Sequence, residues 1–413
     1  MSAFAIPLSG LEATASSLNN IANNLANLNT DGYKDQNLSF GDIFNQMQGT
    51  SGNGDPIQTG DGVQVAGSTA NFSDGSVSST GVSSNMALQG NGFFVMQNAS
   101  GATDYTRSGD FTTNSSGQLT SPSGELVMGY PAVDGVVSTD AALAPISVNQ
   151  ATTMPGVAST SFSMSTNLDS STAAGTSFST PITVYDSLGT AQTLSVNYTN
   201  TSPNNWSYSV TLPASATGGT GSPTTIASGA LTFNSSGQLT APTGTVTGIN
   251  ITGLADGAAP MNLTWNLNGS SSSPTITQQN ATSATTTTNQ DGFGVGSLTG
   301  YSVLPDGTVQ GQFSNKQTLA LGQVAVATFA NTQGLQQTGT NDYQATFASG
   351  AAVVGQAGAG GNGSITGGSV EGSNVSLSGE FSKMIVAQQG YEANAKALTT
   401  LNQISQATIQ MMS

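Results

Sequence analysis

The chain has 413 residues, of which 36% are hydrophobic and only 6% charged, and its formal net charge is −16. It contains no His and no Cys, which excludes imidazole bases, thiol nucleophiles, ordinary zinc sites and disulfides. Its five Lys and Arg residues are scattered, whereas nucleic acids and anionic membranes require clustered cations. Regularly spaced apolar residues among many Gly, Ser and Thr residues predict a folded, mainly β protein.

The first helix is predicted over residues 3–29. Apolar and small residues recur there at alternating steps of three and four, as in a heptad repeat: Leu8, Leu11, Ala15, Leu18, Ala22 and Leu25. Ile21 and Leu28 widen this row. Gly32 suits the left-handed position that follows a helix.

The middle of the chain is predicted to contain nested β domains. Residues 31–70 have few apolar anchors and are interpreted as an extended connector. Short alternating segments separated by turn residues fill 71–148 and 291–370, which we expect to form one discontinuous antiparallel β domain. Residues 149–290 are predicted to form an inserted outer β domain.

Within the predicted insertion, three segments alternate in the manner of strands: Ile182–Tyr185, Leu194–Tyr198 and Trp206–Val210. The polar tracts 213–225 and 268–289 are interpreted as linkers.

Repeated turn chemistry supports this β assignment. The sequence of Asn114–Thr120 recurs as Asn234–Thr240, with Phe111 and Phe233 just upstream. Each copy predicts a strand, a four-residue turn and a strand. Asp306-Gly307 predicts a further hairpin turn.

The last helix is predicted from about Ser378, as N-cap, to Met412, with Glu380 in its first turn. Gly390 is the weak point in its interior. The predicted apolar face comprises Phe381, Ile385, Ala395, Leu398, Leu401, Ile404, Ile409 and Met412. The terminal domain thus consists of residues 1–30 and 371–413.

The two helices either cover the protein's own β core or pair, as a coiled coil, with each other and with copies from other subunits. The Gly-rich approach to the second helix favours pairing with copies. The residues expected to carry assembly are Leu8, Leu11, Leu18, Ile21, Leu25, Leu28, Phe381, Ile385, Leu398, Leu401 and Ile404.

Catalysis has little support in this sequence. Ser and Thr hydroxyls lack a His to activate them. Carboxylate pairs such as Asp55 with Asp61, or Asp306 with Asp342, stand in Gly-rich contexts typical of turns. We therefore expect no enzyme activity, no cofactor and no catalytic metal, and a surface calcium ion, if bound, would be structural.

Several motifs resemble those of bacterial flagellar rod and hook proteins. Asn20-Ile21-Ala22-Asn23 with Asn29-Thr30-x-Gly32-Tyr33-Lys34 is similar to the family's N-terminal signature, although Asn24-Leu25-Ala26 adds three residues inside it. Gly92-Phe93-Phe94 and Tyr105-Thr106-Arg107 resemble its first β-domain motif, with Gly129-Tyr130-Pro131 closing it. Met384–Lys396, after Ser373-Asn374-Val375, resembles its C-terminal helix.

The inserted domain and Val184-Tyr185-Asp186 are similar to hook members of the family. This resemblance implies a curved, flexible tube of identical subunits, which acts as a universal joint. It also implies contacts with rod, hook–filament junction and hook cap proteins. Such a subunit leaves the cell through the flagellar type III export apparatus without a cleaved signal peptide.

The first cation is Lys34, so no positive n-region precedes an apolar run, and no stretch approaches a membrane span. The alternatives left open are a distal rod or other axial component and, less favoured, a secreted β-rich adhesin.

Overall fold

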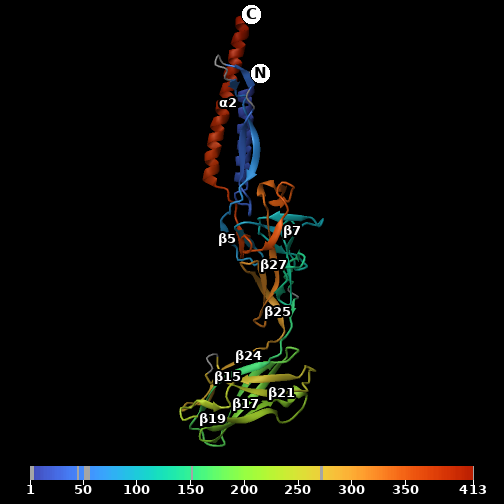
Figure 1. Ribbon diagram of the computed structural model, residues 1–413, viewed down its shortest axis with the longest axis vertical. Helices are drawn as coiled ribbons and strands as arrows, with labels where there is room; N and C mark the ends of the chain where they lie inside the picture. Colours follow the sequence, from blue (N-terminus) through green and yellow to red (C-terminus); the bar gives the residue numbers. More distant parts are fainter. Residues whose placement is uncertain (1–3, 44–45, 51–55, 150–151, 270–272, 413) are drawn as a thin grey trace. The chain divides into compact units, whose positions relative to one another are not determined.

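The computed structural model describes residues 4–43, 46–50, 56–149, 152–269 and 273–412. The chain divides into two compact units. Unit 1 consists of residues 1–149, 300–311 and 318–413, and unit 2 of residues 150–299 and 312–317. Both units are built mainly from β-strands, and the long helices belong to unit 1 (Figure 1). The prediction of a mainly β protein with helical ends is confirmed.

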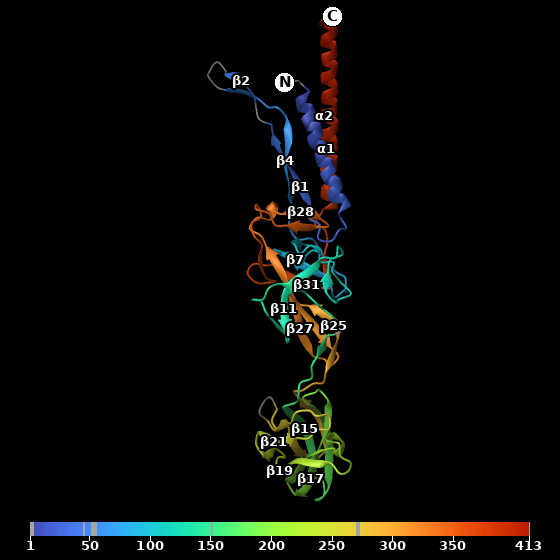
Figure 2. The same cartoon turned by 90° about the vertical axis from the view of Figure 1, so that its right-hand side faces the viewer.

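The two predicted helices are α1 (Ala5–Ala26) and α2 (Leu377–Met412), which lie side by side (Figures 1 and 2). Gly32 has φ +70°, in the left-handed region expected for it. The predicted N-cap of α2 is wrong by two residues. Ser376, rather than Ser378, accepts a hydrogen bond on its Oγ from the Gly379 amide at 3.3 Å. None of the described helices is long and apolar enough to cross a membrane.

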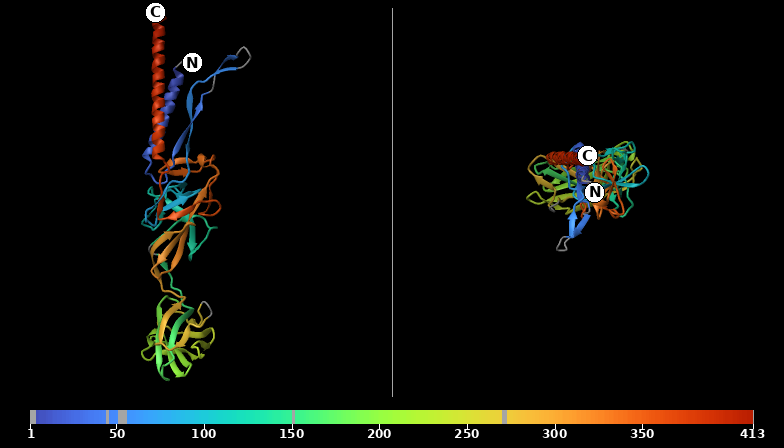
Figure 3. Two further views of the ribbon diagram at one scale, coloured as in Figure 1. Left: turned by 90° about the vertical axis from the view of Figure 1, so that its left-hand side faces the viewer. Right: turned by 90° about the horizontal axis from the view of Figure 1, so that it is seen from above.

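Residues 31–70, where an extended connector was expected, contain paired strands. β1 (Gln36–Asp42) pairs antiparallel with β4 (Val63–Ala70), and both contact α1 (Figure 3, left). β2 (Gln46–Thr50) pairs with β3 (Pro56–Thr59). The apolar side chains are few because the β1–β4 ribbon has no core of its own and lies against the helices.

The β body of unit 1 is built around a network of short antiparallel strands. Its central strands are β27 (Thr318–Thr328), β11 (Leu126–Val133), β7 (Phe93–Gln97), β8 (Thr103–Thr106), β29 (Asp342–Gln344) and β28 (Gln336–Gly339). The flanking strands are β9 (Thr112–Thr113), β10 (Leu119–Thr120), β12 (Val136–Val137), β13 (Ala144–Pro145) and β30 (Val353–Gln356). Two further pairs join early and late segments: β5 (Val77–Ser79) with β32 (Ser369–Glu371), and β6 (Met86–Gln89) with β31 (Ser364–Gly367).

The Gly-Phe-Phe motif explains how β7 becomes the centre of this body. Successive side chains of a strand point to opposite faces. Phe93 and Phe94 accordingly belong to two different buried clusters, one on each side of the sheet. Burial on both faces is why β7 reads as a continuous apolar run rather than an alternating one.

Unit 2 contains two five-stranded sheets that enclose one core. One sheet has β21 (Thr245–Ile251), β22 (Met261–Asn266), β15 (Ser161–Asp169) and β23 (Ile276–Gln279), with β24 (Ala284–Gln290) also paired to β15. The other has β16 (Ser177–Tyr185), β17 (Ala191–Ser202), β18 (Asn205–Leu212), β19 (Thr224–Phe233) and β20 (Leu239–Ala241). The shorter elements of this unit are β14 (Thr153–Met154) and η1 (Ala214–Thr217). Strands β25 (Gly296–Val303) and β26 (Thr308–Phe313) contribute residues to both units.

The alternation in β17 and β18 places Leu194, Val196 and Tyr198 beside Trp206 and Tyr208 in this core. The three strands predicted in this region are therefore confirmed. The linker interpretation of 268–289 is wrong, because β23 and most of β24 lie there. The Thr-rich β24 reads as polar because its described side chains are largely exposed. Tract 213–225 contains η1 and the start of β19.

The repeated turn sequence forms the same structure twice. In both copies the backbone amide of the Asn donates to the carbonyl oxygen of the Gln four residues later. Asn114 N donates to Gln118 O, and Asn234 N donates to Gln238 O, each at 2.9 Å. The Asn side-chain oxygen accepts from the Ser and Gln amides in each turn. A third short turn ends in Asp306-Gly307, where the Gly307 amide donates to Leu304 O. Turn chemistry was thus predicted correctly from local sequence.

Candidate assembly surface

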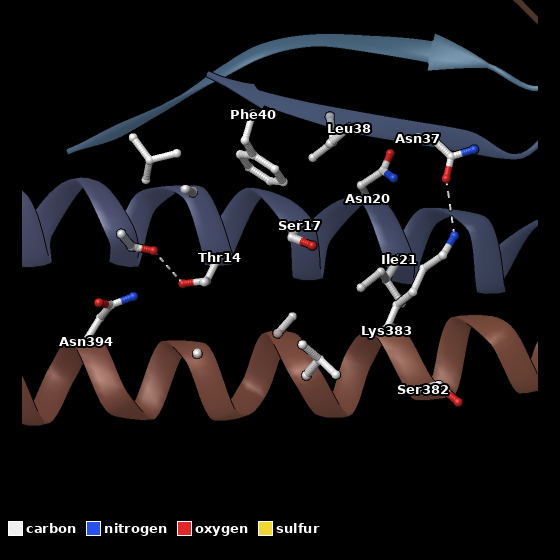
Figure 4. Close-up of a pocket in the computed structure, with 16 residues that line it drawn as sticks. Thr14, Ser17, Asn20, Ile21, Asn37, Leu38, Phe40, Ser382, Lys383 and Asn394 are labelled. Atoms are coloured by element: carbon white, nitrogen blue, oxygen red, sulfur yellow. Dashed lines mark hydrogen bonds between the residues drawn. The ribbon is translucent and has the colours of Figure 1, made fainter. Parts of the chain in front are cut away.

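Helices α1 and α2 meet through small and polar residues. Gly10 lies against Asn394, and Thr14 lies against Gly390 (Figure 4). Residue numbers rise along one helix as they fall along the other, so the pair is antiparallel. A Cβ added at Gly10 would lie 2.7 Å from Asn394 Nδ2, and one at Gly390 would lie 3.2 Å from Thr14 Cγ2. Both glycines therefore permit close approach of the helices, which explains Gly390 in the helix interior.

Asn24 anchors the base of this helix pair. It is completely buried. Its Nδ2 donates to Asp35 Oδ1 at 2.6 Å and to Glu380 Oε2 at 3.3 Å, and its Oδ1 accepts from the Tyr33 hydroxyl at 3.1 Å. One side chain thereby joins α1, the segment after it and the first turn of α2. Lys383 Nζ donates to Glu380 Oε1 at 2.6 Å, so the buried carboxylate also has a cationic partner.

Burial shifts the pKa values of the ionisable groups around Asn24. Desolvation raises the pKa of the Asp35 carboxyl, while the positive charge of Lys383 opposes this shift. Desolvation, with the negative charges of Asp35 and Glu380, also raises the pKa of the Tyr33 hydroxyl. The hydroxyl consequently stays protonated and can donate to Asn24.

A second polar junction ties both chain ends to the β body. Lys34 Nζ and Glu371 Oε1 lie 2.6 Å apart with both side chains fully buried. Lys34 also donates to Ser73 O at 2.8 Å. Arg107 Nη1 lies 3.7 Å from Glu371 Oε2, and its guanidinium lies 5.4 Å from the Phe93 ring centroid. Desolvation lowers the pKa of Lys34, while the Glu371 carboxylate opposes the shift.

The predicted leucine row of α1 is not the row that contacts α2. The side of α1 that faces α2 is formed by residues 7, 10, 14, 17, 21 and 24. Each member of the leucine row directly follows one of these residues in the chain. One residue corresponds to about 100° around a helix. The row formed by Leu8, Leu11, Leu18 and Leu25 therefore lies to one side of the α1–α2 contact.

The predicted assembly residues of the α1 region lie in three environments. Ile21 is buried between the helices and the ribbon. Leu8 is exposed. The remaining members are half-buried: Leu11, Leu18, Leu25 and Leu28.

On α2 the predicted assembly residues are more exposed to solvent. Phe381, Ile385 and Ile404 are exposed, whereas Leu398 and Leu401 are half-buried. Since Gly10 lies level with Asn394, α2 continues about 13 residues, or about 20 Å, beyond the start of α1. Figure 2 shows this projecting end.

A groove of about 750 Å³ runs along α1, with the β1–β4 ribbon on one side and α2 on the other (Figure 4). Leu38 and Phe40 of the ribbon line one wall, and Val386 of α2 lines the other. Thr14 and Ser17 of α1 lie at its floor. The groove places further apolar surface beside the helices.

The contacts that fix the helix pair were missed at the sequence level. Asn24, Glu380 and Lys34 are polar or charged, whereas the predicted helix contacts were derived from apolar rows. The available signal was the Asn-rich stretch around Asn23-Asn24, because Asn is uncommon in a helix unless its amide has a defined partner. Asp55 of the predicted carboxylate pairs lies outside the described residues. Asp306 is a turn residue whose Oδ1 accepts from the Thr308 amide.

Comparison with known proteins decides the family. Four family profiles match parts of the chain: "Flagella basal body rod protein" over 6–34, "Flagellar hook protein FlgE/F/G D1 domain" over 87–199, "Flagellar basal body protein FlaE D2 domain" over 158–293 and "Flagellar basal body rod FlgEFG protein C-terminal" over 366–411. The second and third matches overlap over 158–199. Flagellar hook protein FlgE of Escherichia coli is 36% identical over 99% of this chain and 100% of its own length. The chain belongs to the flagellar hook protein family.

Further members of the hook protein family match as completely. FlgE of Salmonella typhimurium is 37% identical over 99% of both chains, and FlgE of Rhizobium meliloti is 31% identical over 98% of this chain and 97% of its own. A crystal structure of Helicobacter pylori FlgE2 aligns with 70% of this chain and 98% of its own at a TM-score of 0.48 and 15% identity.

The resemblance found in the sequence motifs is confirmed. The protein is a structural subunit of the flagellar hook, a component of the hook–basal body, and not an enzyme. The hook assignment also decides against the rod and adhesin alternatives, because the hook relatives match along nearly the whole chain.

Proposed function

We propose that this hook subunit polymerises through the outward rows of α1 and α2, which pack against the same helices of neighbouring copies. The observation that carries the proposal is the leucine row, which lies beside the α1–α2 contact and is exposed at Leu8 and only half-buried at Leu11, Leu18 and Leu25. Burying an exposed leucine contributes about 1.5–3 kcal/mol. Repetition along both helices and around a tube multiplies this small gain into a stable polymer.

The projecting end of α2 supports the same arrangement. Ile404, Ile409 and Met411 are exposed there, beyond the reach of α1. Residues 397–412 carry no charge, so this end approaches another copy of an anionic chain with little repulsion. Subunits joined in this way form a hollow, helical tube lined by terminal helices.

The polymer acts as a flexible joint that transmits torque to the filament. Unit 2 supports this part of the proposal, because its core is closed and its outer surface is largely neutral and polar. Neutral polar surfaces slide past one another at smaller cost than paired charges or interlocked apolar residues. Rotation of a curved tube requires such sliding at every turn.

The terminal segments of the chain indicate which other proteins the tube contacts. The terminal segments match profiles described for rod proteins, so rod and hook–filament junction proteins with similar ends continue the same helical packing. The hook cap protects the growing end, and the flagellar type III apparatus exports the subunit unfolded, without a cleaved signal peptide.

Point variants test the helix rows. Ile385→Ser and Ile404→Ser remove exposed apolar side chains from α2, so the monomer should keep its circular dichroism and thermal unfolding. Polymer formation, measured by sedimentation, should be lost or shifted to much higher concentration. Leu188→Ser is the matched control, because Leu188 is 54% exposed in unit 2 and Ile385 is 55% exposed in α2.

Electron microscopy completes the test. Wild-type protein should form curved tubes, and chains lacking residues 1–30 or 380–413 should stay monomeric with folded β units. Normal tubes from either truncated chain would contradict the proposed role of the terminal helices.

A further inference from the structure

Three carboxyl groups gather on one face of the β body. They belong to Glu125, just before β11, to Asp104 of β8 and to Asp342 of β29. Met96 of β7 pairs with Val127 on one side and with Asp104 on the other, so Glu125 and Asp104 point to the same face of the sheet. Strand β29 pairs with β8, and the Asp342 charge acts on Glu125 from there. Asp104 is 3% exposed and Asp342 is 6% exposed, so solvent screens these charges little.

Asp104 is the ionised member of this group. Gln344 Nε2 donates to its Oδ1 at 2.7 Å, and Asn98 Nδ2 donates to its Oδ2 at 2.8 Å. The orientation of the Asn98 side chain is fixed, because its Oδ1 accepts from the Ser100 and Ala102 amides. Both oxygens of Asp104 therefore face N–H donors, which favour the charged carboxylate.

Glu125 is the protonated member. Its Oε2 atom is buried, and no N–H or hydroxyl group of the described residues donates to it. Its carboxyl group instead shares a hydrogen bond with Asp104. A hydrogen bond between two carboxyl groups requires a proton, and the donors around Asp104 leave that proton on Glu125. Burial, together with the negative charges of Asp342 and Asp104, raises the pKa of Glu125 from its ordinary value of 4.5 to about 7.

The elements around this group supply no opposing cation among the described residues. Strands β7, β10 and β28 contain no ionisable side chain. Tyr105 and Tyr343 belong to the buried cluster on the other face of the sheet, and the Arg107 guanidinium lies over a ring of that cluster. Asp31 and Asp110 line a pocket of about 590 Å³ beside β29 and add only negative charge.

The turn between β28 and β29 connects these charges to the segment that follows α1. Thr340 has φ +50°, in the left-handed region that β-branched residues rarely adopt. Its Oγ1 donates to Asp342 Oδ2 at 2.6 Å, which holds the turn. The next residue, Asn341, donates from Nδ2 to Asp31 O at 3.0 Å. A negative charge on Glu125 would repel Asp342 and weaken this turn.

We propose that Glu125, Asp104 and Asp342 form a proton-dependent clasp in the β body. One proton, shared between Glu125 and Asp104, holds the start of β11 to β8 and lets Asp342 keep its place beside the turn. Loss of the proton leaves three negative charges together and loosens the turn that contacts the segment after α1. The clasp belongs to the single chain and does not depend on polymerisation.

The clasp predicts how the stability of the β body depends on pH. The folded chain holds the proton more tightly than the unfolded chain. The stabilisation is therefore complete below about pH 4.5, declines as the pH rises and is lost above about pH 7. Glu125→Gln keeps an N–H donor for Asp104 and carries no charge at any pH. The denaturant midpoint of the wild type should fall relative to that of Glu125→Gln between about pH 5 and about pH 8.

Glu12→Gln is the matched control for this comparison, because Glu12 is exposed on α1. Its denaturant midpoint should follow that of the wild type at every pH. Parallel pH profiles of the wild type and Glu125→Gln would overturn the proposal.

Carboxyl NMR reads the proton directly. The chain has five Glu residues, so carbon-13 labelling of Glu gives few carboxyl signals, and the signal absent from Glu125→Gln is that of Glu125. In the wild type this signal should titrate near pH 7, and the backbone amide signals of Thr340 and Asn341 should shift with the same midpoint. Titration near pH 4.5 would overturn the clasp. Amide signals that stay fixed while Glu125 titrates would contradict its link to the turn.

Discussion

The sandwich of unit 2 and the helix pair of unit 1 use apolar residues in opposite ways. The sandwich buries its large side chains, including Trp206 and Trp265, and leaves Ser and Thr outside. The helix pair meets through Gly10, Thr14 and Asn394 and leaves its leucines exposed or only half-buried. The sandwich core is therefore closed within one chain, whereas the helix pair leaves part of its apolar surface accessible.

This difference suits a subunit that must fold alone and then polymerise. A helix pair held by strong apolar contacts would have no apolar row left for copies. Contacts between small residues bring the two backbones together, while buried polar residues such as Asn24 fix their register. Most helical stability in proteins comes from packing of an apolar face, so the outward rows are expected to supply it in the polymer.

The largest predicted effect concerns the closed core. Trp265→Ala removes a side chain that is 0% exposed and should destabilise unit 2 by about 3–5 kcal/mol. Both tryptophans of the chain lie in unit 2, so fluorescence of Trp206 during guanidinium unfolding reports this unit alone. The helical circular dichroism should unfold as in the wild type.

Thr264→Ala, on the same strand β22, is the control and should change the unfolding free energy little, because Thr264 lies outside the buried core cluster. Equal destabilisation of the helical signal by Trp265→Ala would contradict the independence of the two regions.

A smaller effect is predicted at the polar anchor of the helix pair. Asn24→Leu removes hydrogen bonds to Asp35 and Glu380 and leaves buried carboxylate oxygens without this donor, at a cost of about 1–3 kcal/mol. Thermal unfolding followed at 222 nm should shift to lower temperature, while Trp fluorescence should not change.

Asn19→Leu makes the same chemical change at an exposed position of α1 and should have almost no effect on the helical transition. If Asn24→Leu were instead neutral or stabilising, the apolar gain would exceed the hydrogen-bond loss, and the register of the helices would depend on packing alone.

Prediction from the sequence succeeded where a local pattern of residues determines the structure. Strands of the sandwich were predicted because Leu194, Val196 and Tyr198 alternate with polar residues over a single core. The repeated turns were predicted because Asn, Ser and Gly act locally. Both terminal helices were also found, since a heptad row identifies a helix whichever partner it packs against.

The remaining features depend on contacts between distant residues. The buried pair Lys34–Glu371 joins positions 337 residues apart, and no local pattern relates them. The Thr-rich β24 was interpreted as a linker because an exposed edge position needs no apolar alternation. The leucine row was predicted to carry assembly, but its place to one side of the α1–α2 contact could be found only from the position of Gly390 on the facing helix.

The smallest effect concerns the start of α2, where the structure places the cap at Ser376 and not at the predicted Ser378. Ser376 Oγ accepts from the Gly379 amide, whereas Ser378 lies inside the helix, where its O accepts from the Ser382 hydroxyl. Removing an N-cap hydroxyl costs about 1 kcal/mol. Ser376→Ala should therefore lower the helical unfolding temperature by a few degrees, and Ser378→Ala should leave it unchanged or raise it slightly, because Ala favours helix interiors. The reverse order would place the cap at Ser378 and shorten α2 by two residues.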